Sequence, residues 1–301
     1  MPVLRPLILA AADSPRLRRF VGRYGMRLGA ARFVAGESLD QAVVVLRRLN
    51  DRGLLTNTTL LGEHVRDRDE AERVTQTYEE TLRRIDAEKL RTNVSVKPTH
   101  LGALIDEELV YANVERLVAE AGRLGNFIRI DMEDSPLVDL TLRLYRRLRE
   151  AGHDNVGTVL QAYLYRTADD LAALLPLRPN LRIVKGAYKE PPSLAYPKKA
   201  DVDASYDRLV ARCIAEAGFT AVATHDQARI DHALALGAGP DRMEIQMLYG
   251  VRSQLQLDLV GAGHRVLVAT PYGPDWYPYL MRRLAERPAN VAFLLRNLVR
   301  S

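Results

Sequence analysis

Apolar and polar positions in this chain define two alternating kinds of segment. Eight short apolar runs each end on or beside a polar residue, and stretches with helical periodicity separate them. Parallel strands that are buried on both faces have such continuous apolar runs, and barrel enzymes carry their chemistry at the carboxyl ends of the strands. The pattern therefore predicts an α/β fold, a (β/α)8 TIM barrel. The predicted strands are residues 54–61, 94–96, 127–130, 156–160, 181–184, 219–223, 243–245 and 266–269.

The chain of 301 residues fits a single barrel of about 250 residues with an extension of about 50. Residues 1–50 contain no strand candidate, and Ala42, Val45, Leu46 and Leu49 recur at helical spacing. We therefore predict an N-terminal helical arm over residues 1–50 and a catalytic barrel domain over residues 51–301. Helices are expected at residues 67–90, 106–124, 201–217, 229–236, 253–261 and 276–287, with a tail helix at residues 288–299.

Two helix starts carry recognisable capping patterns. Ser135 followed by Pro136 predicts an N-cap and a first-turn proline, and Thr167 with Asp170 resembles a capping box. The proline-rich loop at residues 189–200 is expected to shape one side of the barrel mouth.

The basic character of the chain has an ordinary explanation. The net charge is +5 and the pI about 9.3, but basic residues are mixed with acidic ones on the predicted helices, which indicates solvated faces with local ion pairs. Attraction to an anionic membrane surface is the alternative. No apolar stretch reaches the roughly 20 residues of a membrane span, and no signal-peptide pattern is present. We expect a cytoplasmic protein, with peripheral attachment at the inner face of the membrane as the alternative.

Several common catalytic signatures are missing from the sequence. There is no G-x-G-x-x-G after a strand, no P-loop, no G-x-S-x-G elbow and no paired histidine spacing, so zinc hydrolysis and serine hydrolysis are not expected and no metal is an expected partner. Because the basic residues are mixed with acidic ones, a nucleic acid is not an expected partner either. The only cysteine, Cys213, is interpreted as an apolar filler on a helix.

The last barrel helix has the sharpest local pattern. Tyr279, Arg282, Arg283 and Glu286 lie on one helical face, and the helix follows the eighth strand through a turn, so it is expected to lie over the barrel mouth. Paired guanidinium groups there could bind a carboxylate. The alternative is an ordinary amphipathic helix with a solvated basic face.

Seven motifs in order, all at predicted strand ends or on the closing helix, resemble those of proline dehydrogenase, in its small monofunctional bacterial form. The resemblance spans residues 36–288. Its motifs are Glu63 after Leu61-Gly62, Ser95-Val96-Lys97, Arg129-Ile130-Asp131-Met132-Glu133, Val184-Lys185-Gly186-Ala187-Tyr188, Ala223-Thr224-His225, Gln246-Met247-Leu248-Tyr249-Gly250, and the helix with Tyr279, Arg282, Arg283 and Glu286.

The resemblance implies a distorted barrel that binds FAD noncovalently and oxidises L-proline to pyrroline-5-carboxylate by hydride transfer. Electrons would pass to a membrane quinone, and a pyrroline-5-carboxylate dehydrogenase is an implied partner. The implied catalytic residues are Asp131 and Arg182, the latter at the redox-active flavin nitrogen. The implied substrate residues are Lys97, Arg282 and Arg283 for the carboxylate, Tyr279 and Leu248 for the ring, and Glu63 as a gate that pairs with Arg282 or Arg283. The implied cofactor residues are Met132, Gln161, Val184, Lys185, Gly186, Ala187, Thr224 and His225, with Tyr188 and Glu286 as supporting residues.

Physical chemistry agrees with this assignment. Proline joins a carboxylate to a small apolar ring, so its site needs positive charge on one side and apolar surface on the other. Lys97, Arg282 and Arg283 beside Tyr279 and Leu248 meet both needs. Negative charge that develops on a flavin would be stabilised by a guanidinium such as that of Arg182.

Other interpretations remain open at this stage. The main enzyme alternative is a barrel aldolase in which Lys97 or Lys185 forms a Schiff base. A nonenzymatic basic protein that docks on membranes or nucleic acid is a different class. Individual residues have structural alternatives: Asp131 as a loop cap, His225 as a structural histidine, Tyr249 and Tyr272 as packing at the barrel rim, and Trp276 as a helix anchor. Ala269 stands where many proline dehydrogenases have tyrosine, which predicts a wider substrate pocket.

Overall fold

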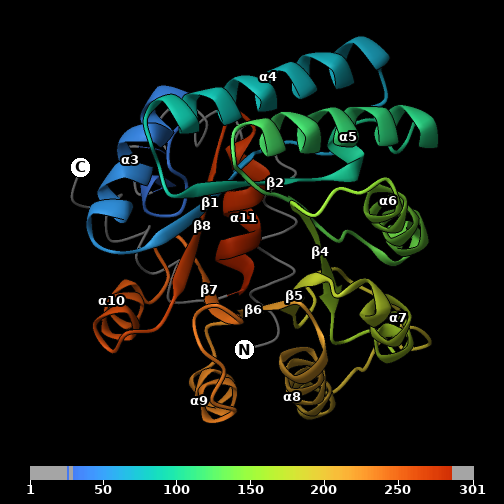
Figure 1. Ribbon diagram of the computed structural model, residues 1–301, viewed down its shortest axis with the longest axis vertical. Helices are drawn as coiled ribbons and strands as arrows, with labels where there is room; N and C mark the ends of the chain where they lie inside the picture. Colours follow the sequence, from blue (N-terminus) through green and yellow to red (C-terminus); the bar gives the residue numbers. More distant parts are fainter. Residues whose placement is uncertain (1–25, 27–29, 287–301) are drawn as a thin grey trace.

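The computed structural model describes residue 26 and residues 30–286, apart from the side chains of residues 282–286. Eight parallel strands form a closed barrel in sequential order from β1 to β8 (Figure 1). The strands are β1 Leu55–Leu60, β2 Thr92–Val96, β3 Ile128–Ile130, β4 Val156–Gln161, β5 Asn180–Val184, β6 Phe219–Ala223, β7 Met243–Leu248 and β8 Val266–Tyr272. The (β/α)8 barrel and all eight predicted strands are confirmed.

Helices follow the strands and surround the barrel (Figure 1). The predicted helices are confirmed within a few residues at each end, except the tail helix at residues 288–299, which lies outside the described residues. The helices are α3 Leu39–Asp51, α4 Arg68–Ala87, α5 Glu107–Arg123, α6 Val138–Glu150, α7 Thr167–Leu174, α8 Lys199–Glu216, α9 Gln227–Ala235, α10 Ser253–Gly261 and α11 Trp276–Glu286.

The capping roles predicted for Ser135 and Thr167 are wrong, whereas Pro136 does lie in the first turn of a 3-10 helix that leads directly into α6. Ser135 opens the short 3-10 helix Ser135–Leu137 instead of capping α6, and its hydroxyl and backbone N–H both donate to Glu190. Thr167 is the first residue of α7, and its hydroxyl donates to the backbone carbonyl of Gln161 at 2.6 Å. In both cases an acceptor on another loop or strand competes successfully with the helix terminus for the hydroxyl.

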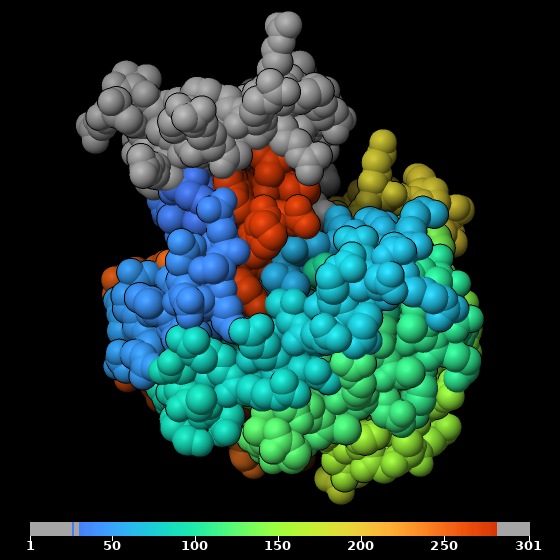
Figure 2. Space-filling model, turned by 90° about the horizontal axis from the view of Figure 1, so that it is seen from above, coloured from blue at the N-terminus to red at the C-terminus, as the bar shows by residue number. Residues whose placement is uncertain are grey.

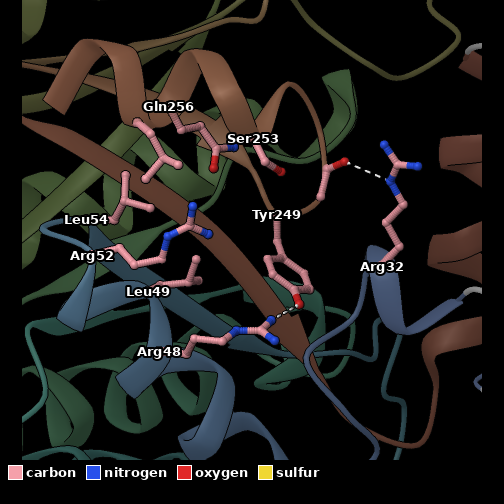
Figure 3. A pocket seen from close by; sticks show the side chains of 10 residues that line it. Arg32, Arg48, Leu49, Arg52, Leu54, Tyr249, Ser253 and Gln256 are labelled. Atoms are coloured by element: carbon pink, nitrogen blue, oxygen red, sulfur yellow. Dashed lines mark hydrogen bonds between the residues drawn. The ribbon is translucent and has the colours of Figure 1, made fainter. Parts of the chain in front are cut away.

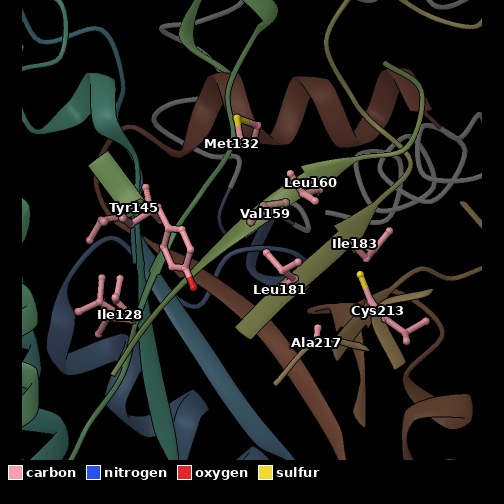
Figure 4. Close-up of a cluster of buried hydrophobic side chains, with 14 of the residues drawn as sticks. Ile128, Met132, Tyr145, Val159, Leu160, Leu181, Ile183, Cys213 and Ala217 are labelled. Carbon is pink, nitrogen blue, oxygen red and sulfur yellow. The ribbon is translucent and has the colours of Figure 1, made fainter. Parts of the chain in front are cut away.

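The two faces of the strands have different chemistry, and this difference positions the site. Side chains that face the helices are aliphatic and form the main core, as Ile128, Leu181 and Ile183 do (Figure 4). Cys213 on α8 belongs to the same core, as predicted, and burial raises the pKa of its thiol to about 12. The barrel interior instead holds asparagine, serine, arginine, glutamate and glutamine side chains that bond to one another across strands. A polar interior can hold charged groups in fixed positions.

The ends of the described chain pack together beside the barrel. α3 contacts β1 and β8, and the indole N–H of Trp276, the first residue of α11, donates to Glu37 at 2.7 Å. A second apolar cluster joins Phe33 and Val34 to Trp276, Leu280 and Met281. In Figure 2 α11 lies against the early, blue part of the chain, and in Figure 1 it crosses the centre of the ring of strands. The anchoring role predicted for Trp276 is confirmed. Most of the predicted arm, residues 1–25 and 27–29, lies outside the described residues.

No helix within residues 30–286 combines the length and apolar character needed to cross a bilayer.

Candidate active site

The carboxyl ends of all eight strands surround one mouth of the closed barrel, which brings distant motifs together. Lys97 follows β2, Asp131 follows β3, and Gln161 ends β4. Lys185 follows β5, Thr224 and His225 follow β6, and Leu248 ends β7.

Arg182 is the most constrained charged side chain in this region. It points into the barrel from β5 and is only 9% exposed. Its Nε donates to Oε1 of Gln246 at 2.5 Å, its Nη1 to Oδ1 of Asp131 at 2.8 Å and its Nη2 to the hydroxyl of Ser95 at 3.3 Å. Contacts from β2, β3 and β7 therefore fix one guanidinium from three directions.

Asp131 is held by its backbone as well as by its side chain. Its N–H donates to the carbonyl of Val96 at 2.9 Å, and the carboxylate is half-buried beside Arg182. The predicted catalytic residues thus form a salt bridge, and the carboxylate does more than cap a loop.

Lys97 and Glu63 form a second salt bridge, with 2.7 Å between Nζ and Oε2. The two side chains are 17% and 22% exposed. The sequence did not predict this pairing, because Glu63 was expected to pair with Arg282 or Arg283, whose side chains lie outside the described part of the structure. The pair places a lysine ammonium group at the mouth with its position fixed by a carboxylate.

Buried neighbours hold the loop that follows Lys97. The carboxylate of Glu133 accepts from both the backbone N–H and the hydroxyl of Thr99, and burial raises its pKa. The imidazole of His100 is buried, and desolvation followed by the charge of Lys97 lowers its pKa to about 4. The loop that carries Lys97 is therefore held in place by buried hydrogen bonds.

Lys185 is the centre of a cluster of charges on the other side of the mouth. Its ammonium group donates to Asp203 at 2.5 Å and to Asp226 at 2.9 Å. The hydrogen bond from Lys185 lowers the pKa of Asp226 to about 2. Lys185, a predicted cofactor residue, therefore binds both carboxylates. Because Lys185 follows β5, Asp226 follows β6 and Asp203 lies on α8, these salt bridges join the three elements.

The polar residues of β4 and β6 brace the same edge. Nε2 of Gln161 donates to the carbonyl of Glu133 at 2.8 Å, and the hydroxyl of Thr224 accepts from the N–H of Asp226. Nε2 of His225 accepts from the backbone N–H of Leu248 at 2.8 Å, so this ring nitrogen carries no proton. His225 therefore holds the backbone of a predicted substrate residue.

The remaining predicted residues occupy varied environments. Met132 is buried in the main apolar core, Val184, Gly186 and Tyr188 are half-buried, and Ala187 is exposed. Tyr279 on α11 is half-buried and packs on the second apolar cluster. The side chains of Arg282, Arg283 and Glu286 on the same helix lie outside the described residues.

Sequence reasoning assigned no role to Ser95, Glu244 or Gln246, which contact or support Arg182. A signal was present, since Glu244 and Gln246 are polar residues at alternate positions of a strand whose other members are apolar. Alternation of this kind indicates one polar face, here the barrel interior.

A hollow of about 160 Å³ lies away from these residues, between α3 and the start of α10 (Figure 3). Three arginines, Arg32, Arg48 and Arg52, surround it. Arg48 donates to the hydroxyl of Tyr249 at 2.9 Å, and Arg32 to the carbonyl of Gly250 at 3.3 Å. Tyr249 is buried in this packing at the rim, as predicted, and so is Tyr272, whose hydroxyl lies 2.6 Å from that of Thr81.

Comparison with known proteins agrees with this geometry. The family profile described as proline dehydrogenase matches residues 42–296. The chain is 43% identical to the proline dehydrogenase of Deinococcus radiodurans over 98% of both chains, and 39% identical to proline dehydrogenase 2 of Bacillus subtilis strain 168 over 99% of both. Its fold matches the crystal structure of proline utilization A from Bdellovibrio bacteriovorus inactivated by N-propargylglycine, with a TM-score of 0.81 and 25% identity. The match covers 90% of this chain and 34% of that larger protein. The chain therefore belongs to the proline dehydrogenase family.

Proposed function

We propose that this chain oxidises L-proline to pyrroline-5-carboxylate with FAD as the hydride acceptor, and that the electrons then pass to a membrane quinone. The proline dehydrogenase activity follows from membership of the family, which is flavin-dependent. The observation that best supports the proposed site is the guanidinium of Arg182, which is fixed at the barrel mouth by Asp131, Ser95 and Gln246.

The donor set at the mouth fits a flavin. When bound, FAD would supply the acceptor for a hydride from C5, the ring CH2 carbon next to the proline nitrogen. The amine would have lost one proton beforehand, the C=N bond would form as the hydride leaves, and the remaining N–H proton would then be released. Arg182 supplies charged N–H groups where negative charge would develop. Gln161, Thr224 and the backbone at Gly186 and Ala187 supply further polar groups at neighbouring strand ends. Met132, Val184, Lys185 and His225 remain predicted cofactor residues.

Lys97 is the described cation proposed to hold the proline carboxylate. It stands at the end of β2, and Leu248 and Tyr279 are proposed as the apolar wall. Arg282 and Arg283 complete the proposed carboxylate site from α11, with Tyr188 and Glu286 in support. Clustered positive charge would also favour the neutral form of the substrate amine, which must lose its proton before the hydride leaves.

The aldolase alternative is less well supported. A Schiff-base lysine is activated by an apolar pocket or by another cation. Lys97 and Lys185 instead each donate to a carboxylate, of Glu63 in one case and of Asp203 and Asp226 in the other. These contacts favour binding and positioning roles for both lysines.

The proposed acceptor and partner rest on chemistry. A net charge of +5 would favour contact with an anionic membrane surface, where a quinone is available. The product is a reactive imine in equilibrium with an aldehyde, so a pyrroline-5-carboxylate dehydrogenase is the proposed next enzyme.

A visible spectrum of the purified protein tests the proposal. We expect flavin absorption bands that bleach when L-proline is added without oxygen and return when a soluble quinone follows. A flavin-loaded protein whose bands survive millimolar L-proline would contradict the proposed substrate. A colourless protein that borohydride traps covalently with a carbonyl compound would favour the aldolase.

A further inference from the structure

A line of polar side chains runs through the barrel from its amino-terminal end to its mouth. Arg265, just before β8, donates from Nε to Oε2 of Glu244 at 2.8 Å. Nε2 of Gln246 donates to the other carboxylate oxygen of Glu244 at 2.6 Å. Oε1 of Gln246 then accepts from Arg182, which in turn binds Asp131. The line connects the far end of the barrel to the proposed flavin site.

The middle of this line is almost completely removed from water. Glu244 is 3% exposed and Gln246 is 4% exposed, both on β7. On β6, which lies between β5 and β7, the residue paired with both Arg182 and Glu244 is Ala221. Its small side chain leaves the path between Arg182 and β7 open. The contact between Arg182 and Gln246 therefore depends on side chains of two strands that are not neighbours.

Glu244 determines which end of the Gln246 amide faces Arg182. Both carboxylate oxygens of Glu244 accept hydrogen bonds, one from Arg265 and one from the NH2 group of Gln246, which leaves the carbonyl oxygen of Gln246 toward the guanidinium. With a neutral amide at position 244, the Gln246 side chain could turn over and place its NH2 group against Arg182.

A second cation in the barrel, Arg129, makes the orientation of the Gln246 amide important for the position of Arg182. The guanidinium of Arg129 is buried on β3, where burial and then the charge of Arg182 lower its pKa to about 9. This guanidinium donates to the backbone carbonyls of Thr158 and Asn180 and to the side chain of Asn180, and it lies over the ring of Phe127. Two cations inside one barrel repel each other, so the acceptors that bind Arg182, Gln246 among them, are needed to hold its position.

We propose that Glu244 is a positioning residue for proline oxidation: it turns the carbonyl of Gln246 toward Arg182 and so fixes the guanidinium at the barrel mouth. This inference rests on the proposed function, because it assigns Glu244 a role only through the contact expected between Arg182 and the flavin.

Glu244→Gln is the direct test. It keeps the shape of the side chain but replaces one of the two acceptor oxygens that face Gln246 and Arg265 with an NH2 donor. We expect the flavin-loaded variant to have a kcat about tenfold lower with the KM for L-proline nearly unchanged. Its flavin midpoint potential should be more negative, because a mobile Arg182 stabilises the reduced flavin less. A purely structural role for Glu244 would lower stability without moving the potential.

Two further variants sharpen the test. Glu244→Gln combined with Gln246→Glu restores every donor and acceptor pair in the line, so kcat should recover to within about threefold of the parent protein. Glu107→Gln is the matched control, because Glu107 is an exposed carboxylate on α5 that accepts from both Nε and Nη2 of Arg143. This control should change neither kcat nor the potential.

The proposal is overturned if folded, flavin-loaded Glu244→Gln keeps both kcat and midpoint potential at the parent values. If that variant does not fold, Gln246→Met replaces it, since it breaks the same link but leaves Glu244 on Arg265. Parent values in that variant would equally overturn the proposal. The potential is measured with a chemical reductant and without proline. A failure of the proposed substrate, seen as an unbleached parent protein, is therefore distinguishable from a failure of the role of Glu244.

Discussion

At the scale of single residues, Arg182 is a buried cation of the proposed site. Its guanidinium is buried, lies beside a second buried cation and is held by three side chains. A charge with this many fixed contacts needs little rearrangement when negative charge develops beside it. Hydrogen bonds to the polar side chains of the barrel interior offset the free energy of removing this guanidinium from water.

Replacing Arg182 should therefore affect the chemical step most. We expect Arg182→Gln to lower kcat about 100- to 1,000-fold, as loss of a charge-stabilising donor does in other enzymes. The flavin should stay bound, since the predicted cofactor residues on β4 and β6 are untouched. Anaerobic reduction by L-proline in a stopped-flow instrument measures the step directly. Arg208→Gln, on the exposed face of α8, is the control, and a kcat within tenfold of the parent value in Arg182→Gln would refute the assignment.

The resemblance to proline dehydrogenases predicts a tyrosine where this chain has Ala269, and the structure places Ala269 beside the proposed substrate wall. It pairs with Leu248 across β7 and β8, and its side chain is half-buried. We expect Ala269→Tyr to narrow the pocket and lower the KM for L-proline about tenfold, an effect of the size seen for filled apolar pockets. Steady-state kinetics with L-proline and a ring-substituted analogue measure it. Unchanged values for both substrates would remove the idea of a wider pocket.

Individual site residues differed in how far the sequence revealed them. Asp131 could be named because it is a carboxylate directly after an apolar strand, whereas Arg182 was implied only by the resemblance to proline dehydrogenases. The salt bridge between Lys97 and Glu63 could not be predicted, since partner choice depends on the distance between two loops. Glu244 was missed although it alternates with Gln246 along β7, because this alternation indicates a polar face and not which partner each side chain contacts.

At the scale of elements, the loops after β4 and β5 are joined to each other. The N–H of Ala162 donates to the carbonyl of Val184 and that of Tyr163 to the carbonyl of Lys185, at 2.8 and 2.9 Å. Gly186 continues this arrangement with φ at +115°, which side chains rarely adopt. A Cβ atom there would lie 2.2 Å from the ring of Tyr163. The loops fit together only because position 186 has no side chain.

Gly186→Ala should consequently destabilise both loops. We expect about 1–3 kcal/mol lower stability from the backbone strain and the clash, together with weaker retention of FAD during gel filtration. Gly237→Ala is the matched control, because Gly237 also has a positive φ, +71°, but its Cβ would meet nothing within 4 Å. If both variants lose the same stability and retain FAD equally, the close approach of Gly186 to the ring of Tyr163 does not determine the stability of these loops or FAD binding.

The elements themselves were the most predictable level of the structure. Eight apolar runs became eight strands because burial on both faces requires continuous apolar sequence over a few residues. Helix starts were less predictable. Ser135 and Thr167 have typical capping side chains. In the folded barrel, however, the hydroxyl of Ser135 donates to Glu190 and that of Thr167 donates to the carbonyl of Gln161. Acceptors of this kind come from other strands and loops, so the sequence around a helix start does not reveal them.

At the scale of the whole molecule, ion pairs between neighbouring helices surround the barrel. Arg116 on α5 binds Glu72 and Glu79 on α4, while Arg143 and Arg147 on α6 bind acidic residues of α5. The sequence correctly indicated that most basic residues lie on solvated faces with acidic partners. It indicated partners on the same helix, whereas many of these pairs join adjacent helices. Exposed pairs contribute little singly, but all of them depend on ionised carboxylates.

The free energy of unfolding should fall in two stages as the pH is lowered, each stage over its own pH range. His100 is held neutral, with its pKa lowered from 6.5 to about 4, so the unfolded chain binds a proton first. The free energy of unfolding then falls as the pH drops from about 6.5 to about 4, by at most about 3 kcal/mol. Glu120 and Asp226 have pKa values lowered to about 2, from 4.5 and 3.8. Their contribution is complete above those ordinary values and is lost as the pH falls toward 2.

Urea unfolding at a series of pH values separates the two stages. His100→Gln should flatten the dependence between pH 6.5 and 4 and leave the lower stage intact. Glu133, whose pKa burial raises, acts in the opposite direction, because its contribution is lost as the pH rises past its folded value. The difference between parent and variant cancels that effect and isolates His100. High salt should weaken the lower stage more than the upper one, because exposed ion pairs are screened and a buried imidazole is not. Equal slopes for parent and His100→Gln would show that desolvation of this imidazole does not govern the upper stage.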